Sequence, residues 1–367
     1  MHSSQINRRP LSPSEAINCL SVGAAHSDQA VNFELADRID LARNTSLPSP
    51  LATVSQGFRR GTKPEVLFPG GRFLHRPAVG GNGKIVFEGV DTILAPGVLT
   101  AAPGLVPMEL GRVKHSCGTS NAAALATRCA ALALESLSAA AIPADIEPLG
   151  SESIAVLLKA LVVHGASWGD AEAIINGAFP EADGRTLARL KQQFLGYGQV
   201  DMARCLSCSE QRATALAWGN ISREQAQIYT LPLPPSLASN TEIRRVTATL
   251  AWLTPANYRH QNYRRAQLWL DIRETRLASN SRGVDFQAAR RGTVEHRIWE
   301  GSHAVPFVEG ATMEIGVNCK DDAGKLDGRV PYAVAVSVEL GVTSTLDIYN
   351  EIRQRVRPAV AVTTNPV

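Results

Sequence analysis

The sequence has no run of eighteen apolar residues and only six cysteines among its 367 positions. The first absence excludes a fully apolar transmembrane segment, so we expect no membrane span and no membrane partner. The second excludes a disulfide framework. The first ten residues, MHSSQINRRP, also lack the apolar core of a secretory signal. Together these absences predict a protein of the reducing cytoplasm.

A strong net charge is missing as well. The formal net charge is +3, from 37 lysine and arginine residues against 34 aspartate and glutamate residues. The arginine pairs are scattered and have no interleaved aromatic residues, so they indicate a solvated surface and no nucleic-acid partner. These pairs are Arg8-Arg9, Arg59-Arg60, Arg264-Arg265 and Arg290-Arg291.

No group of residues has the spacing of a metal or cofactor site. Cys205 and Cys208 have CxxC spacing, but without a second pair they indicate two structural thiols. Residues 321–328 are acidic but lack calcium-loop spacing, so they indicate a hairpin tip. Residues 80–83 precede a strand instead of opening a helix, which favours a hairpin turn over a phosphate loop. We therefore expect no cofactor and no metal.

The first part of the chain mixes short strands with helices. Apolar runs indicate strands within 17–25, at 64–69 and at 84–87. Alanine-rich composition or helical spacing of apolar residues indicates helices at 120–140, 151–164, 170–179 and 185–195. Gly196-Tyr197-Gly198 is a typical helix end.

After about residue 222, strands follow one another without helices between them. The alternation in 243–253 places Val246, Ala248, Leu250 and Trp252 on one side. Further strands are expected at 267–272, 293–299, 313–319 and 332–340, with turns at 280–283 and 321–324. This succession predicts an antiparallel sandwich. An amphipathic stretch at 346–356 predicts a terminal helix.

Ser120 is a candidate nucleophile at the start of the helix expected at 120–140. A helix start favours negative charge, so an oxyanion forming beside this serine would be stabilised. Gly118 would let a substrate carbonyl approach the backbone without a side chain in the way. The same position also suits a serine that only caps the helix, so the decapeptide alone leaves both roles open.

Several neighbouring motifs bear on that choice. Val22-Gly23-Ala24 is followed by a serine-rich stretch at 46–55 and then by residues 63–70, KPEVLFPG. Next comes Gly118-Thr119-Ser120-Asn121-Ala122, with Ala126 four residues on. The expected helix at 154–166 and then Gly196-Tyr197-Gly198 complete the order of motifs along the chain. This succession resembles the C-terminal part of the catalytic domain of subtilisin-like serine peptidases, the subtilases, with Glu65 in place of the family's usual aspartate.

The resemblance implies an α/β fold class. Residues 1–222 would be the C-terminal portion of a subtilase catalytic domain, a parallel-sheet domain truncated at its N-terminal side. Residues 223–345 would form an antiparallel, jelly-roll-like β-sandwich of the kind appended to many subtilases. Residues 346–367 would form a terminal helix and tail.

The resemblance also implies a serine-type endopeptidase with Ser120 as nucleophile and the Ser120 backbone N–H as one oxyanion donor. The family's aspartate, histidine and oxyanion-binding asparagine precede the V-G-A strand, and no positions here match them. We therefore expect a chain that is inactive alone. Its expected partners are a protein or peptide substrate and a separately encoded N-terminal subtilase fragment.

Other acids and bases in the chain match no family motif: His26, His75, Asp28, Asp37 and Asp40. His115 lies five residues before Ser120, and the intervening turn is expected to direct it elsewhere.

Two alternative functions remain at this point. One is a non-catalytic subtilase remnant that acts as a protein-binding module. The other is an unrelated hydrolase that uses Ser120 with His164 and Asp201. The second is disfavoured because Ala122 replaces a glycine of the nucleophile elbow and His164 lies on an apolar helix.

Overall fold

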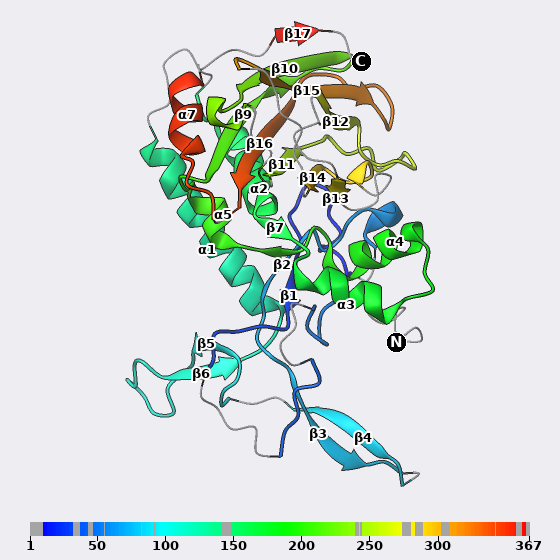
Figure 1. The fold of residues 1–367 in the computed structure, drawn as a ribbon. Helices are drawn as coiled ribbons and strands as arrows, with labels where there is room; N and C mark the ends of the chain where they lie inside the picture. Colours follow the sequence, from blue (N-terminus) through cyan, green and yellow to red (C-terminus); the bar gives the residue numbers. More distant parts are fainter. Residues whose placement is uncertain are drawn as a thin grey trace.

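The chain folds into a small parallel-sheet part, two projecting hairpins and a larger antiparallel part (Figure 1). The computed structural model describes residues 10–31, 37–42, 47–54, 56–81, 83–90, 93–140, 148–238, 242, 244–273, 280–282, 289–301, 309–341, 343–356 and 362–364. The mixed α/β composition agrees with the expected fold class.

The parallel sheet has the strand order β1-β2-β8-β7. β1 (Val22–Ala25) and β2 (Val66–Pro69) are parallel along four residue pairs, and β8 (Gln199–Val200) continues the parallel arrangement through Leu67 and Gln199. β7 (Ala166–Ser167) closes the sheet in antiparallel orientation. Val66, Leu67 and Phe68 are fully or almost fully buried, because helices cover the sheet.

Five helices accompany this sheet: α1 (Thr119–Ala139), α2 (Ser151–His164), α3 (Asp170–Ala178), α4 (Gly184–Leu195) and α5 (Met202–Leu206). The first four confirm the predicted helices within one residue at each end. α4 ends at Gly196, whose φ of 59° is a conformation that favours glycine. Among the described residues, short 3-10 turns lie at Phe58–Arg60 and Pro235–Leu237.

The small residues of α1 explain how it packs. Ala122, Ala126, Cys129 and Ala133 recur every three or four residues, and all four are buried against the sheet and α2. By length and composition alone, α1 is long and apolar enough to cross a membrane, and most of its side chains are not buried. The expectation of no membrane span therefore stays a prediction.

Two hairpins project from the end of the molecule opposite the large β-sheets (Figure 1). β3 (Leu74–Val79) pairs with β4 (Ile85–Val90), and β5 (Val98–Ala101) pairs with β6 (Val113–Ser116). The turn between β3 and β4 begins with a hydrogen bond from the Gly80 N–H to the Lys84 carbonyl, 2.8 Å. This confirms the hairpin turn predicted there, of which Asn82 lies outside the described residues.

The C-terminal part contains two antiparallel sheets. The five-stranded sheet has the order β13-β14-β11-β16-β9, and the four-stranded sheet has the order β12-β15-β10-β17. In the first sheet the strands are β9 (Arg212–Ile221), β11 (Arg244–Trp252), β13 (Asn280–Arg282), β14 (Val294–Gly301) and β16 (Val330–Leu340). In the second they are β10 (Gln225–Pro232), β12 (Ala266–Arg273), β15 (Thr312–Asp321) and β17 (Val362–Thr364).

One hydrophobic core joins the facing sides of these sheets. Val246, Ala248, Leu250 and Trp252 of β11 all lie in it, as their alternation predicts, together with Val317 of β15. The terminal helix α7 (Ile348–Arg355) contributes Ile348 and Ile352 to the same core. This packing is that of two sheets stacked face to face.

The structure changes two boundaries that the sequence suggested. β9 lies before residue 223, yet it pairs with β16 along ten residues, so the five-stranded sheet begins at Arg212. Residues 280–282, expected in a turn, form β13 at the sheet edge, and Gly283 lies outside the described residues.

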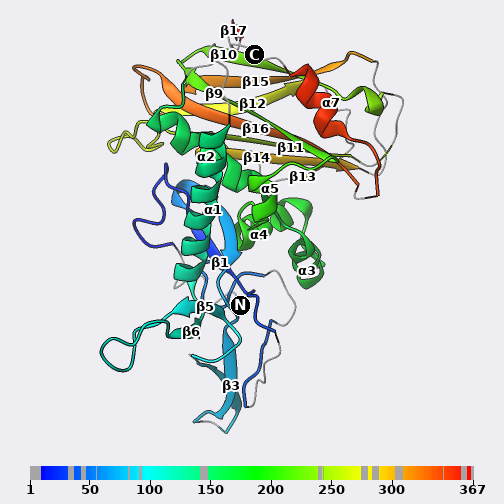
Figure 2. The ribbon, with the colours of Figure 1, turned by 90° about the vertical axis from the view of Figure 1, so that its left-hand side faces the viewer.

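The two parts of the chain share a second core. It contains Phe68 from β2, Leu157 from α2 and Ala333 from β16. α2 thus lies between the parallel sheet and the outer face of the five-stranded sheet (Figure 2). The site-bearing part is therefore fixed against the C-terminal sheets.

Candidate active site around Ser120

The turn that presents Ser120 depends on two glycines that follow β2. The Gly118 N–H donates to the Gly70 carbonyl at 2.8 Å, which places the start of α1 at the carboxyl ends of β1 and β2. A Cβ atom on Gly70 would lie 2.4 Å from the Ala24 Cβ, and one on Gly71 would lie 2.5 Å from the Ser116 carbonyl oxygen. The Gly70-Gly71 pair is therefore needed for this close approach.

Replacing Gly70 by alanine is expected to destabilise the fold by about 1–3 kcal/mol, because the added methyl group overlaps Ala24 and forces the backbone apart. Thermal or urea unfolding measures the effect. Gly81→Ala is the matched control, since its added methyl group meets no atom within 4 Å. Equal stability of the two variants would contradict the close approach.

Asn121 holds the turn together. Its side-chain Nδ2 donates to the carbonyls of Gly70 (3.3 Å) and Ser116 (3.1 Å). Asn121 has no role that the sequence alone could assign, because both acceptors belong to other segments. The only sequence feature that could have pointed to a role for Asn121 was its position directly after the candidate nucleophile.

Ser120 itself is exposed in the first turn of α1. Its hydroxyl has no hydrogen-bond partner among the described residues, so it does not cap the helix. Gly118 precedes it with φ of 148°, and no atom lies within 4 Å of the place where a Gly118 side chain would begin. Free N–H groups of a helix start, open space and an exposed hydroxyl therefore meet at one point.

The structure shows where His115, the histidine closest to Ser120 in the sequence, lies. His115 is half-buried on β6, where it pairs across the hairpin with Leu99. Its N–H donates to the Ile93 carbonyl at 2.9 Å, which fixes the backbone of this strand end. No hydrogen bond joins His115 to Ser120 among the described residues.

His26 and Asp40 form a buried pair that the sequence did not reveal. The His26 Nε2 lies 2.8 Å from the Asp40 Oδ1, with both side chains at most 3% exposed. The Phe73 N–H donates to the other ring nitrogen, Nδ1, at 3.4 Å. Both nitrogens are therefore occupied, and His26 has none left to accept the proton of Ser120.

The remaining upstream candidates have structural roles. Arg72 binds Asp28 through an ion pair of 2.7 Å, which contributes to lowering the pKa of that carboxyl against the opposing effect of burial. His75 stacks edge-on with Phe73, and burial lowers its pKa. Asp37 lies 3.9 Å from Arg38 and is two-thirds exposed. None of these residues is hydrogen-bonded to Ser120.

His164 and Asp201 do not form a catalytic pair with Ser120. His164, the last residue of α2, is buried against β11 and β16, where it hydrogen-bonds the Thr249 hydroxyl (2.9 Å) and the Ser337 hydroxyl (2.5 Å). Asp201 caps α5 by accepting the Ala203 N–H at 2.9 Å. The packed-histidine interpretation of His164 is thus confirmed, and the geometry contains no Ser120–His164–Asp201 triad.

A buried ion pair lies at the start of the KPEVLFPG segment. The Lys63 ammonium contacts the Glu65 carboxylate at 2.6 Å, and both side chains are less than a tenth exposed. The second carboxylate oxygen accepts the Ser21 N–H at 2.7 Å. Glu65 therefore ties the start of β1 to the start of β2, at the end of these strands opposite to the Ser120 turn.

The described cysteines match neither a zinc site nor a CxxC redox pair. Cys205 is buried and contacts Cys129 of α1, and this contact contributes to raising the pKa of its thiol. Cys208 is exposed on its own. In the described part of the chain, no three histidine, cysteine, aspartate or glutamate side chains gather as metal ligands would.

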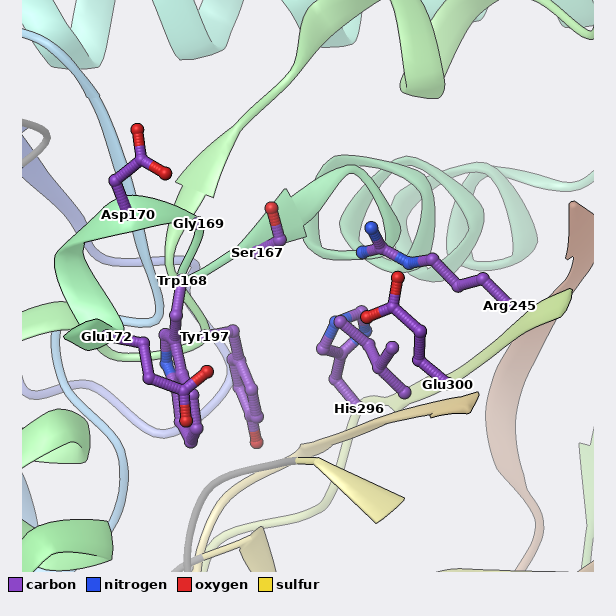
Figure 3. A pocket seen from close by; sticks show the side chains of 10 residues that line it. Ser167, Trp168, Gly169, Asp170, Glu172, Tyr197, Arg245, His296 and Glu300 are labelled. Carbon is purple, nitrogen blue, oxygen red and sulfur yellow. The ribbon is translucent and has the colours of Figure 1, made fainter. Parts of the chain in front are cut away.

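A separate cavity of about 350 Å³ lies between α3 and the five-stranded sheet (Figure 3). Trp168, Tyr197, Arg245 and His296 are among its lining residues. The cavity adjoins Ser167, which pairs with Gln199 at the starting end of the parallel strands, whereas Ser120 lies at their carboxyl ends. This cavity is therefore not the site of Ser120.

Comparisons with known proteins agree with this architecture. The model of the subtilase family matches residues 3–198, more than half of the chain and ending at the Gly196-Tyr197-Gly198 motif. An uncharacterized protein of Sinorhizobium fredii, y4bN, is 24% identical over 329 residues. The match covers 87% of this chain and 65% of that relative, so the chain spans about two thirds of the relative's length. The family expected from the sequence is confirmed: the chain belongs to the subtilase family.

Proposed function

We propose that this chain carries the nucleophile of a subtilisin-like serine endopeptidase, with Ser120 attacking the carbonyl of a peptide bond. The observation that carries the proposal is the exposed Ser120 hydroxyl in the first turn of α1, beside the open space at Gly118. The Ser120 N–H and the positive end of α1 would stabilise the oxyanion that forms in the attack.

The general base and its acid would come from a further polypeptide, a separately encoded N-terminal subtilase fragment. Two observations support this part of the proposal. In the described ranges no histidine is hydrogen-bonded to Ser120, and His26, His75, His115 and His164 have other surroundings. In addition, about a third of the y4bN sequence has no counterpart in the match.

The outer side of α1 offers a surface for such a fragment. Ala123, Ala124 and Thr127 are exposed on the side turned away from the parallel sheet. A helix face made of such small side chains allows another backbone to approach closely. The fragment would therefore dock along the helix that carries Ser120.

The six cysteines are all free thiols, which supports a reducing, cytoplasmic location as part of this proposal. The C-terminal sheets are assigned no separate activity. They would hold α2, and through it the Ser120 turn, in place.

A fluorophosphonate probe tests the proposal, because it reacts with a serine only when a base has activated it. The isolated chain is expected to show no more labelling than its Ser120→Ala variant. A polypeptide encoded upstream of this chain, in whichever frame carries the family's aspartate and histidine motifs, is expected to restore labelling at Ser120.

The other outcomes are equally informative. Stoichiometric labelling of the isolated chain would show that the base is already present, and the partner would be unnecessary. Binding of the fragment without labelling would favour the alternative, a non-catalytic subtilase remnant that acts as a protein-binding module.

A further inference from the structure

The second hairpin is unusually apolar on its outside. We define the arm as residues 93–116, which contain β5, its loop and β6 and lead directly to Ser120. Eight large hydrophobic side chains of the arm are between 56% and 89% exposed. They are Ile93, Leu94, Leu99, Leu105, Val106, Met108, Leu110 and Val113. So many exposed apolar side chains in so short a segment are the kind of feature that marks an interaction site.

One face of the arm is attached to the Ser120 turn. Thr100 and Ser116 hydrogen-bond through their hydroxyls at 3.2 Å, and Asn121 donates to the Ser116 hydroxyl at 3.1 Å. The register pairs Leu99 with His115 and Ala101 with Val113, which places these four side chains on the opposite face. That opposite face is the uncovered one.

The charged residues around the arm are mostly basic. Lys114 on β6 is exposed, and Arg112 is held against the loop by a hydrogen bond from its Nη1 to the Pro103 carbonyl, 2.8 Å. The carboxylate of Glu109 is occupied within the loop, where it accepts the Leu105 N–H. The arm is therefore apolar with two basic residues against one acidic residue, and it complements an apolar segment flanked by acidic residues.

The position of the arm indicates what covers it. A peptide whose scissile carbonyl lies at Ser120 extends away from the serine by about 3.3 Å per residue. The four residues of β6 span roughly 13 Å by the same rise. Figure 2 shows β5 and β6 beside the end of α1 from which the peptide would extend, so residues about four or more from the scissile bond would reach the arm on this side. This step rests on the proposed function of Ser120.

We propose that the arm is a substrate-binding exosite, which holds an extended apolar segment of an unfolded polypeptide several residues from the bond that Ser120 attacks. The exosite favours segments with acidic flanking residues over segments with basic ones. It selects unfolded chains, because folded proteins keep such segments in their cores.

The test uses the Ser120→Ala chain, so that binding is measured without hydrolysis. The probes are fluorescein-labelled twelve-residue peptides with the same leucine-, valine- and phenylalanine-rich centre and either glutamate or lysine at both ends, with a glycine–serine peptide as blank. Fluorescence anisotropy is expected to show binding of the glutamate-ended peptide at least tenfold tighter than that of the lysine-ended one.

A triple variant, Leu105→Ser, Met108→Ser and Leu110→Ser, is expected to weaken binding at least tenfold. These side chains are exposed in the loop, so thermal unfolding should be unchanged. The matched control changes three residues outside the arm that are also more than two-thirds exposed, Leu11→Ser, Val31→Ser and Tyr258→Ser, and is expected to bind as the unchanged chain does.

Equal binding by the two triple variants would overturn the exosite. So would preferential binding of phosphatidylcholine vesicles, or self-association of the chain that the arm variant abolishes without any peptide binding. Fluorophosphonate labelling without peptide binding would leave the peptidase proposal intact and reject the arm. Peptide binding that the arm variant abolishes, without labelling under any condition, would reject the peptidase proposal and leave the arm as a peptide-binding surface that is not a substrate exosite.

Discussion

Acidification from pH 7 to pH 4 is expected to lower the free energy of unfolding by about 3 kcal/mol through His296 alone. His296 is buried and lines the cavity in Figure 3. Burial, together with the charge of Arg245, lowers its pKa from 6.5 to about 3. In the unfolded chain the same ring takes up a proton near pH 6.5.

The sign follows from which state binds the proton. Between pH 6.5 and about 3 the unfolded chain holds a proton on His296 that the folded chain does not, so stability is lost as the pH falls through this window. His164 acts in the same direction, since burial and the nearby His296 lower its pKa well below 6.5. Glu295 opposes the trend, because burial raises its pKa.

Urea unfolding at a series of pH values measures the slope of the free energy of unfolding against pH. His296→Gln keeps a group that can bond the Thr249 hydroxyl, which now lies 2.7 Å from the His296 Nδ1, and this variant should flatten the slope between pH 6.5 and 4. The exposed His260 supplies the control, because His260→Gln should leave the slope unchanged. A profile that stays flat to pH 4 in the unchanged chain would contradict a neutral His296.

Glu65→Ala is expected to destabilise the chain by about 3–5 kcal/mol. The substitution leaves the Lys63 ammonium buried without its carboxylate, which lies 2.6 Å away in the folded chain. It also removes the attraction that supports a charge on Lys159, a buried lysine whose pKa burial lowers to about 8. Two buried cations would then share one site without an anion.

A double variant separates the contribution of the ion pair to stability from the contribution of side-chain packing. Lys63→Met with Glu65→Leu removes both charges together and should recover much of the loss, because apolar residues of similar size can replace a buried ion pair. Asp327→Ala is the control: its partner Lys325 lies 3.8 Å away on the surface, so the change should be below about 1 kcal/mol. A small effect of Glu65→Ala in urea unfolding would refute the anchoring role.

The helices could be predicted because their signals are local. The apolar stripe of α2 and the small-residue face of α1 lie within single segments, and each contains enough turns to define a period. β9 was missed because its core-facing positions include Ala213, Ala215 and Ala217, residues with little strand preference of their own. Its strand conformation depends on β16, more than a hundred residues later.

The candidate site also contains features that the sequence predicts and features that it does not. Ser120 and its motif could be recognised within one stretch of sequence, whereas the clamp made by Asn121 joins Gly70 and Ser116 across fifty positions. The His26–Asp40 pair was equally hidden, since only the folded loops bring the two residues to 2.8 Å. The arm was missed because its exposed hydrophobic side chains give no burial pattern to read.

The position of α2 has a consequence for how this protein can be divided. Lys159 of this helix donates to the Asn18 carbonyl on one side and to the Thr293 hydroxyl on the other, while His164 bonds Thr249 and Ser337 of the C-terminal sheets. A shortened chain that ends at residue 222 would keep the helix and lose Thr293, Thr249 and Ser337. Such a piece would leave Lys159 and His164 without these hydrogen-bond partners and would uncover the apolar core that α2 shares with the C-terminal sheets, so the two parts of the chain have to be produced and engineered together.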